Sequence, residues 1–347
     1  MSKRIEKITQ LDSVRAIAAF SVVIFHFLTD YRIGNFPLGP IGVDIFFVIS
    51  GYLITAILLE QKAVIGDKFL IIKNFIIKRV LRLFPVYYLY LTFFLILMYG
   101  FGIYIWDPGD EIYYYTYTEN ILFLKDGMKG MQANHLWTLC VEEQFYLFWP
   151  WLAIFISNRK LILGLLIVIP LALFAKAFSG MDMEELKLIT PVHFDTLGSG
   201  ALFALLLKEK GEGYLQIVQK SHISVLIASL FILILSLSFN LPYFLILLSI
   251  LTLSISLMVG CYYNFGGVFG RILNDSRLSY LGKISYGLYL YHKPFPLFKE
   301  LIEVKFNFQI NGVVAFIISV LLTVLTAHFS YQLVEKRFLK LKERFDL

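Results

Sequence analysis

Long apolar runs separated by short polar breaks are the feature that most limits how this chain can fold. Ten runs of a length that can cross a bilayer as a helix occur among its 347 residues. Backbone polar groups in hydrocarbon must be hydrogen-bonded within their own segment, so the sequence predicts an all-α polytopic membrane bundle of about ten transmembrane helices. The approximate limits are 11–29, 41–59, 83–105, 136–156, 161–179, 191–207, 222–240, 243–262, 284–301 and 311–332.

The composition supports a membrane protein. Apolar residues make up 58% of the chain and charged residues only 16%, whereas about a quarter of a soluble domain is charged. The run 284–301 contains Lys293, Pro294 and Pro296, so we expect a broken or kinked helix there. No signal-peptide core with a cleavage site is evident at the start. We expect a single membrane-embedded domain over 1–347, with no appended soluble domain.

Lysine and arginine are distributed unevenly over the segments between the runs. With the N-terminus inside, the inner segments hold 22 of them and the outer segments 8, with Arg15 inside the first run. Cytoplasmic loops carry such an excess, so both termini should be cytoplasmic in a multi-pass protein of the plasma or inner membrane. The net charge of +6 then reflects topology, and we expect no nucleic-acid partner.

The first apolar run carries four ionisable residues. His26 follows Arg15 by eleven residues, which is about 20° beyond three full turns and a rise of about 16.5 Å, so both lie on one helix face. Asp12 can pair with Arg15 three residues on. Asp30, one turn after His26, could bond one imidazole nitrogen and leave the other as a base. Intramembrane ionisable groups usually mark function, although a polar cluster that locks helices together is the alternative.

A basic segment precedes the third run. Arg79 and Arg82 are three residues apart, with Lys73 and Lys78 nearby, and should share a helix face on the same membrane side as Arg15. Two guanidinium groups so placed can clamp a phosphate. Ordinary anchoring against anionic lipid explains the spacing at least as well.

The stretch HLWTLCVEEQFYLFWP opens the fourth run and carries His135, Trp137, Glu142 and Glu143. A carboxylate in hydrocarbon must be protonated, paired or hydrated. Adjacent residues point about 100° apart, so only one of the two glutamates may face a central chamber. Glu142 should reach a depth similar to His26, and an ion pair between helices is the alternative.

The second run combines polar and small residues. Asp44 lies near its expected outer end, and Ser50, Gly51 and Tyr52 lie at mid-depth. Gly51 would let another helix approach closely, so a packing role is favoured for it and for Ser50.

Other polar residues carry weaker signals. The outer loop 106–135 is rich in tyrosine and acids, which suits stacking on sugar rings or an interfacial aromatic belt. Taken singly, polar residues of the later runs are more often packing residues than ligands: His193, Asp195, His292, His328 and Glu335. Cys140 and Cys261 form no metal or disulfide motif, and we expect no metal site.

Together these segments resemble the acyltransferase 3 family of multi-pass membrane acyltransferases. The resemblance runs in order from LDSVRAIAAFSVVIFHF through GVDIFFVISGYLI, RVLRLFPVYYL, HLWTLCVEEQFYLFWP and FDTLGSGALFA to SYGLYLYHKP and the closing VEK. The family's arginine–ten residues–histidine motif maps to Arg15 and His26, its RxxR motif to Arg79 and Arg82, and its membrane glutamate to Glu142. Where family members often end in Glu-Lys-Pro, this chain has Glu335, Lys336 and Arg337.

The resemblance implies transfer of an acyl group, acetyl by default, from cytoplasmic acyl-CoA to a carbohydrate hydroxyl. We expect His26, Glu142, Asp30 and Arg15 to serve catalysis, with His26 as general base. The phosphates of acyl-CoA are expected at Arg79, Arg82 and Arg15.

The same segments leave some questions open. We expect the cell-surface or lipid-linked glycan acceptor at Asp44, Tyr52, His135 and Trp137. The alternative is a proton-coupled transporter or glycan exporter that uses the same buried groups, although no repeated half is visible. A lipid-binding scaffold without turnover is a third interpretation.

Overall fold

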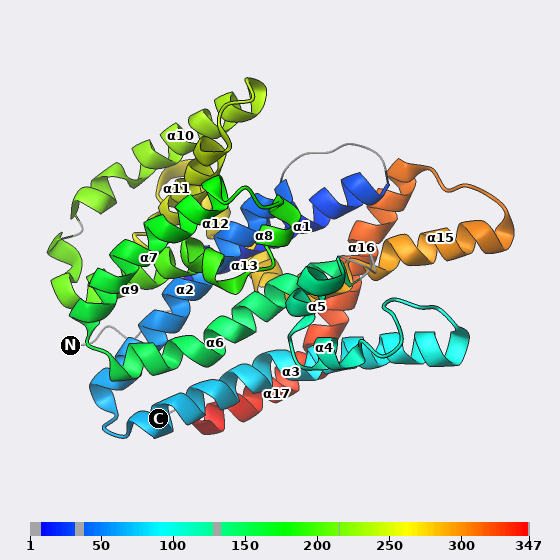
Figure 1. The fold of residues 1–347 in the computed structure, drawn as a ribbon, viewed down its shortest axis with the longest axis horizontal. Helices are drawn as coiled ribbons and strands as arrows, with labels where there is room; N and C mark the ends of the chain where they lie inside the picture. Colours follow the sequence, from blue (N-terminus) through cyan, green and yellow to red (C-terminus); the bar gives the residue numbers. More distant parts are fainter. Residues whose placement is uncertain (1–7, 32–37, 128–132, 215, 346–347) are drawn as a thin grey trace. The chain divides into compact units, whose positions relative to one another are not determined.

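The computed structural model describes residues 8–31, 38–127, 133–214 and 216–345, a part of the chain that is helical and contains no strand (Figure 1). Its elements are α1 (Thr9–Asp30), α2 (Leu38–Val64), α3 (Lys68–Phe101), α4 (Glu111–Tyr115), α5 (Glu119–Asp126), η1 (Asn134–Leu136), α6 (Trp137–Phe155), α7 (Asn158–Phe178), α8 (Met183–Leu186), η2 (Thr190–Phe194), α9 (Thr196–Tyr214), α10 (Gln216–Ser238), α11 (Tyr243–Tyr262), α12 (Gly267–Leu273), α13 (Ser276–Lys283), α14 (Ser285–Tyr291), α15 (Pro294–Phe306), α16 (Gly312–Ser330), η3 (Tyr331–Glu335), α17 (Lys336–Lys342) and η4 (Glu343–Phe345). Of the elements labelled η, η3 is a π-helix and the other three are 3-10 helices.

Among the described residues, seven helices are long and apolar enough to cross a membrane. They are α1, α2, α3, α7, α10, α11 and the stretch Gly312–Lys342, which contains α16. The prediction of an all-helical membrane protein is therefore confirmed. The predicted run 136–156 is helical as α6, but the polar turn from Glu142 to Gln144 lowers its hydropathy. The run 191–207 is shared between η2 and α9. Ten crossings and cytoplasmic termini stay predictions.

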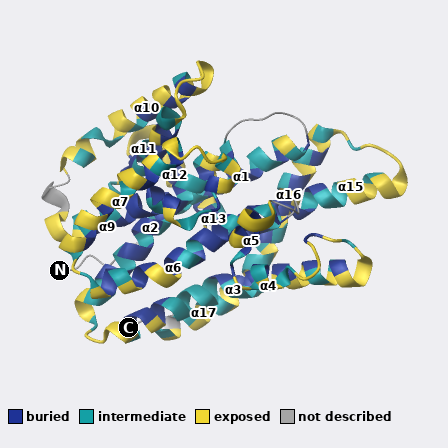
Figure 2. Cartoon of the chain, in the orientation of Figure 1, coloured by how far each residue is buried: buried dark blue, intermediate teal, exposed yellow. Residues whose placement is uncertain are grey.

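The outward faces of several long helices are apolar. On α10, side chains such as Ile227, Phe231 and Ile234 are more than half exposed, and the yellow stripes in Figure 2 follow these faces. Contiguous apolar surface of this extent is rare on soluble monomers. Lipid tails are the environment in which such faces are stable.

The helix break expected near Lys293 is present. α14 ends at Tyr291, and α15 begins at Pro294, which occupies the first helical position, where the missing N–H costs nothing. His292 and Lys293 therefore lie at the junction of two short helices. Both side chains are buried there.

By its packing the chain divides into two compact units, and the prediction of one domain over 1–347 stays a prediction. Unit 1 comprises 1–15, 44–75 and 141–280, and unit 2 comprises 16–43, 76–140 and 281–347.

In unit 1, α2 and α9 cross at two glycines. A Cβ atom on Gly51 would lie 1.9 Å from the Leu197 carbonyl oxygen, and one on Gly200 would lie 2.0 Å from the Val48 carbonyl oxygen. Only glycine permits this approach, so the packing role predicted for Gly51 is confirmed.

Unit 2 has an apolar cluster beside the second half of α1. Val23, Phe27 and Tyr31 pack with Ala315 of α16, and the Tyr31 hydroxyl hydrogen-bonds the Ser319 hydroxyl at 2.5 Å. Because these contacts fix the rotation of α1 about its axis, they also fix the direction in which His26 points.

Candidate active site

A pair of histidines in unit 2 forms the centre of the candidate active site. The His26 Nδ1 atom on α1 lies 2.8 Å from the His292 Nε2 atom, and the two rings are stacked within 5° of parallel. The His292 Nδ1 atom lies 2.6 Å from the carbonyl oxygen of Tyr289. Residues 266 positions apart are thus joined in one hydrogen-bonded chain.

The direction of these hydrogen bonds assigns the tautomers. The Tyr289 carbonyl oxygen can only accept, so His292 Nδ1 carries the proton and a neutral His292 presents Nε2 as an acceptor. His26 Nδ1 must then donate to it. A neutral His26 consequently has its basic lone pair on Nε2, which is the arrangement that a general base requires.

A further histidine of unit 2, His135, lies against this pair. Its ring centroid is 4.8 Å from that of His292, and its side chain is buried. Its carbonyl oxygen accepts hydrogen bonds from the Tyr289 hydroxyl at 2.7 Å and from the Thr138 hydroxyl at 3.2 Å. The sequence placed His135 among the acceptor-binding residues, and the structure brings it to the site, beside the residue that orients His26.

Asp30 forms a salt bridge with Lys293. Its carboxylate lies 3.1 Å from the Lys293 ammonium group, and both side chains are largely buried. At His26 Nδ1 the structure places His292, where the sequence analysis suggested Asp30. Asp30 therefore neutralises Lys293, whose positive charge would otherwise act on the histidine pair.

Sequence reasoning assigned no site role to His292 or Lys293. Both were visible as polar residues next to Pro294 in the run 284–301. A pair of polar residues at a helix break inside a membrane run indicates a buried site. A break frees backbone N–H and C=O groups, and at membrane depth these are tolerated only where protein or a water-filled cavity satisfies them.

In unit 1, Glu142 accepts a hydrogen bond from the Ser50 hydroxyl, with 2.8 Å between the two oxygens. Arg15 pairs with Asp12 as predicted, at 3.9 Å. His26 belongs to unit 2, so its interaction with Glu142 or Arg15 stays a prediction.

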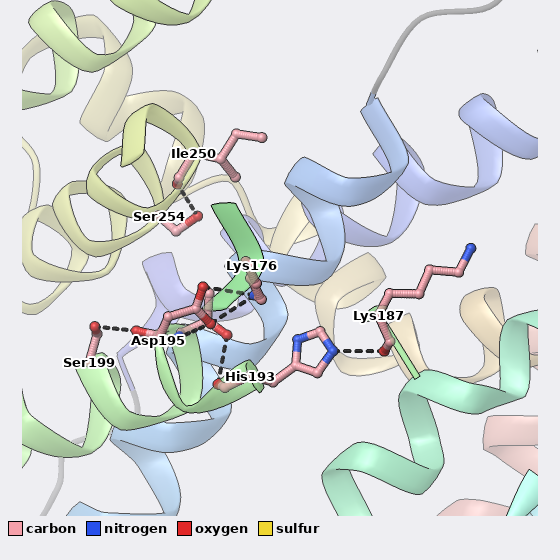
Figure 3. A network of polar contacts seen from close by, with 8 residues as sticks. Lys176, Lys187, His193, Asp195, Ser199, Ile250 and Ser254 are labelled. Carbon is pink, nitrogen blue, oxygen red and sulfur yellow. Dashed lines mark hydrogen bonds and ion pairs between the residues drawn. The ribbon is translucent and has the colours of Figure 1, made fainter. Parts of the chain in front are cut away.

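Asp44 lies in a buried polar cluster of unit 1. Lys176 forms an ion pair with Asp195 at 2.7 Å, and Asp44 is close enough to both to interact electrostatically. Figure 3 shows the Lys176–Asp195 pair and, beside it, the ring of His193 directed at the Lys187 carbonyl oxygen, which is 2.8 Å away. This cluster connects α7, which carries Lys176, and the segment after it to the residues that precede α9.

Tyr52 and Trp137, the last two residues expected to bind the glycan acceptor, occupy different settings. Tyr52 is buried and packs against Phe203 and Tyr262, with ring centroids 5.7 and 6.1 Å apart. Trp137 is the half-buried first residue of α6. Neither arrangement tests acceptor binding, so both assignments stay predictions.

Arg79 and Arg82 lie half-buried on α3, in unit 2. The carboxylate of Glu335, buried at the end of the π-helix η3, interacts electrostatically with Arg82. π-Helical turns are frequent at functional sites, and this one contributes an acidic partner for one arginine of the pair.

Comparison with known proteins indicates the family to which the chain belongs. An acyltransferase domain model matches residues 8–329. YrhL of Bacillus subtilis, provisionally named a peptidoglycan O-acetyltransferase, is 29% identical over 94% of this chain and 54% of its own length. The peptidoglycan O-acetyltransferase OatA of Listeria monocytogenes is 31% identical over 83% of this chain and 49% of its own.

A provisionally named O-acetyltransferase of Staphylococcus aureus strain COL is 29% identical over 97% of this chain and 58% of its own. The chain therefore spans about half the length of these curated relatives. No solved structure shows a significant match. Since the domain model covers nearly the whole chain, this protein belongs to the acyltransferase 3 family.

Proposed function

We propose that this chain is a membrane O-acetyltransferase that carries an acetyl group from acetyl-CoA to a hydroxyl of a cell-surface or lipid-linked carbohydrate. The observation that carries the proposal is the hydrogen-bonded chain from Tyr289 through His292 to His26. It assigns the basic lone pair of a neutral His26 to Nε2, the nitrogen that is proposed to take the proton. Relatives named peptidoglycan O-acetyltransferases make a glycan the acceptor class to test first.

In the proposed reaction, His26 Nε2 takes the proton from the acceptor hydroxyl as its oxygen attacks the thioester carbonyl. The carbon–oxygen bond forms, the carbon–sulfur bond breaks, and the proton on His26 passes to the departing CoA thiolate. His292 accepts from Nδ1 throughout, so it stabilises the imidazolium that exists between these steps. Such base catalysis accelerates a reaction by about 10²–10⁴.

The donor is proposed to enter from the cytoplasm, with its phosphates at Arg79 and Arg82. The predicted role of Arg15 in donor binding belongs to the same proposal. Ten crossings and cytoplasmic termini belong to the same proposal. The first and third runs then place Arg15 and the arginine pair on the donor side. The acceptor would approach from the opposite side, where the segment after α3 is expected.

Donor dependence tests the function. The full chain, reconstituted in proteoliposomes, is given isotopically labelled acetyl-CoA and a glycan acceptor, and the glycan is analysed by mass spectrometry. Formation of an acetyl ester that requires acetyl-CoA supports the proposal. Movement of unmodified glycan or of protons, driven by a gradient and without ester formation, would identify a transporter instead.

A further inference from the structure

Two polar contacts join the second half of α1 to the break between α14 and α15. His26 contacts His292 with 2.8 Å between the ring nitrogens, and Asp30 contacts Lys293 with 3.1 Å between carboxylate and ammonium. His26 and Asp30 are four residues apart on α1, which is about one helical turn, while His292 and Lys293 are consecutive. The two contacts therefore connect the same two segments within one turn of α1.

The backbone at the break gives little support to the position of His292. Pro294 and Pro296 lack an N–H, so the carbonyl groups four residues before them lose the donors that a continuous helix would supply. The His292 carbonyl oxygen instead faces the Phe295 N–H with 3.5 Å between oxygen and nitrogen, which is longer than a typical hydrogen bond. Contacts with other helices are therefore needed to place the break.

On one side, α14 is attached to α16. A Cβ atom on Gly287 would lie 3.1 Å from the Ala327 Cβ atom, so the two helices pack closely there. The Tyr291 hydroxyl hydrogen-bonds the Ser330 hydroxyl at 2.9 Å. These contacts place α14 relative to α16, but the catalytic base lies on α1.

On the other side, apolar contacts bring the break close to α1. The His292 ring meets the Phe27 ring edge-on with 6.1 Å between centroids, and Phe295 packs on the apolar cluster that contains Phe27. Burial of apolar surface is not directional, so these contacts leave the alignment of the break with α1 to polar groups.

The ion pair between Asp30 and Lys293 is directional and shielded from water. The Lys293 ammonium lies 3.1 and 3.4 Å from the two carboxylate oxygens, and the side chains of Lys293 and Asp30 are only 6% and 13% exposed. At this burial, separation of the charges would leave an unpaired ion in the protein interior, which is strongly unfavourable. The pair can therefore hold the break at one distance from α1, as an exposed ion pair would not.

We propose that Asp30 and Lys293 are positioning residues of the transferase and that they act through His292. Their ion pair holds the His292 Nε2 atom at hydrogen-bonding distance from the His26 Nδ1 atom and so keeps the basic lone pair of His26 on Nε2. This inference rests on the function proposed above and gives neither residue a contact with a substrate. A misplacement of about 1 Å in a catalytic arrangement can lower a rate about 100-fold.

The variant that tests the inference is the apolar double Asp30→Leu, Lys293→Met. It leaves no unpaired charge in the interior, so it should fold as well as the wild type, whereas either single substitution would leave one buried ion without its partner. Lys293→Arg keeps the charge and is the conservative variant. The matched control is Lys299→Met, because Lys299 forms its ion pair with Glu303 of the same helix, at 2.8 Å.

Two quantities are measured on the full chain in lipid bilayers. The first is the initial rate of acetyl ester formation, which gives kcat and the KM values for acetyl-CoA and glycan. The second is the scalar coupling between the ring nitrogens of His26 and His292, measured by NMR without substrates on protein labelled with ¹⁵N at histidine. This coupling exists only while the N–H···N hydrogen bond is formed, and its signal is identified by its loss in His292→Leu.

The apolar double should lose the coupling and show a kcat about 10- to 100-fold lower, with an unchanged KM for acetyl-CoA. Lys293→Arg and Lys299→Met should keep both the coupling and the rate. Wild-type coupling and kcat in the apolar double would overturn the inference, as would an equal fall of kcat in Lys299→Met. A lower kcat with the coupling intact would also overturn it, because the ion pair would then not act through His292.

The outcome can be separated from that of the proposed function, because the coupling is measured without the reaction. Ester formation at the wild-type rate by the apolar double would leave the transferase standing and remove the positioning role. A coupling that depends on the ion pair, in a protein that forms no ester, would show that the pair aligns the two histidines and would refute the transferase.

Discussion

Replacing His292 by leucine removes the acceptor at His26 Nδ1 and leaves the rest of His26 unchanged. In the structure His292 Nε2 accepts from that atom at 2.8 Å, so it stabilises the charged form of His26 during transfer. A hydrogen bond to a charged group contributes about 1.5–3 kcal/mol. Each 1.36 kcal/mol changes a rate tenfold, so kcat should fall by about 10- to 100-fold.

The assay is the initial rate of acetyl ester formation at saturating acetyl-CoA and varied glycan. The KM for acetyl-CoA should stay unchanged, because His292 touches the base and not the donor site. His292→Gln, whose side-chain oxygen can take the place of Nε2 as an acceptor, should recover part of the rate. His222→Leu on α10, a half-buried histidine of the other unit, is the matched control. A kcat near that of the wild type in folded His292→Leu would refute the reasoning.

Three further predictions concern other parts of the chain. Arg79→Ala combined with Arg82→Ala should raise the KM for acetyl-CoA more than the KM for the glycan. An unchanged KM for acetyl-CoA in a kinetic titration would contradict the proposal that the two arginines bind its phosphates. Gly200→Ala should destabilise the protein by about 1–3 kcal/mol, because the new Cβ atom would lie 2.0 Å from the backbone of α2. Gly164→Ala, whose new Cβ atom has no neighbour within 4 Å, should leave the stability unchanged. Thermal unfolding measures both variants, and equal unfolding midpoints would contradict the close crossing of α2 and α9. Burial raises the pKa of Glu119, in the segment after α3, from 4.5 to about 8. Between these two pH values the folded state therefore holds a proton that the unfolded state releases. The free energy of unfolding should consequently fall as the pH rises from about 4.5 to 8. Glu119→Gln should flatten that dependence of the unfolding midpoint, and an identical pH profile in the two proteins would argue against it.

The membrane fold could be predicted from the sequence because its signal is local. The apolar runs predicted the seven long apolar helices, and Pro294 predicted the break that follows His292. Gly51 predicted a close helix crossing, although not the identity of the helix. Each of these features depends on neighbouring residues alone.

The arrangement of the site could not be predicted in the same way. The sequence identified His26, but the partner of its Nδ1 atom lies 266 positions away, and helical periodicity carries no information over that distance. Asp30 was the nearest acid in sequence and was therefore expected at the imidazole, whereas it pairs with Lys293. Likewise, Lys176 and Asp195 form an ion pair that joins two segments with no shared motif.

Acetyl transfer by His26→Ala in a single turnover tests the central claim most directly. The purified variant and the wild type, matched for unfolding midpoint, are mixed with labelled acetyl-CoA and glycan, and ester formation is followed in time. Loss of the base predicts a rate about 10²–10⁴ lower with acetyl-CoA binding retained. Ester formation at the wild-type rate would contradict the assignment of His26 as the proton acceptor.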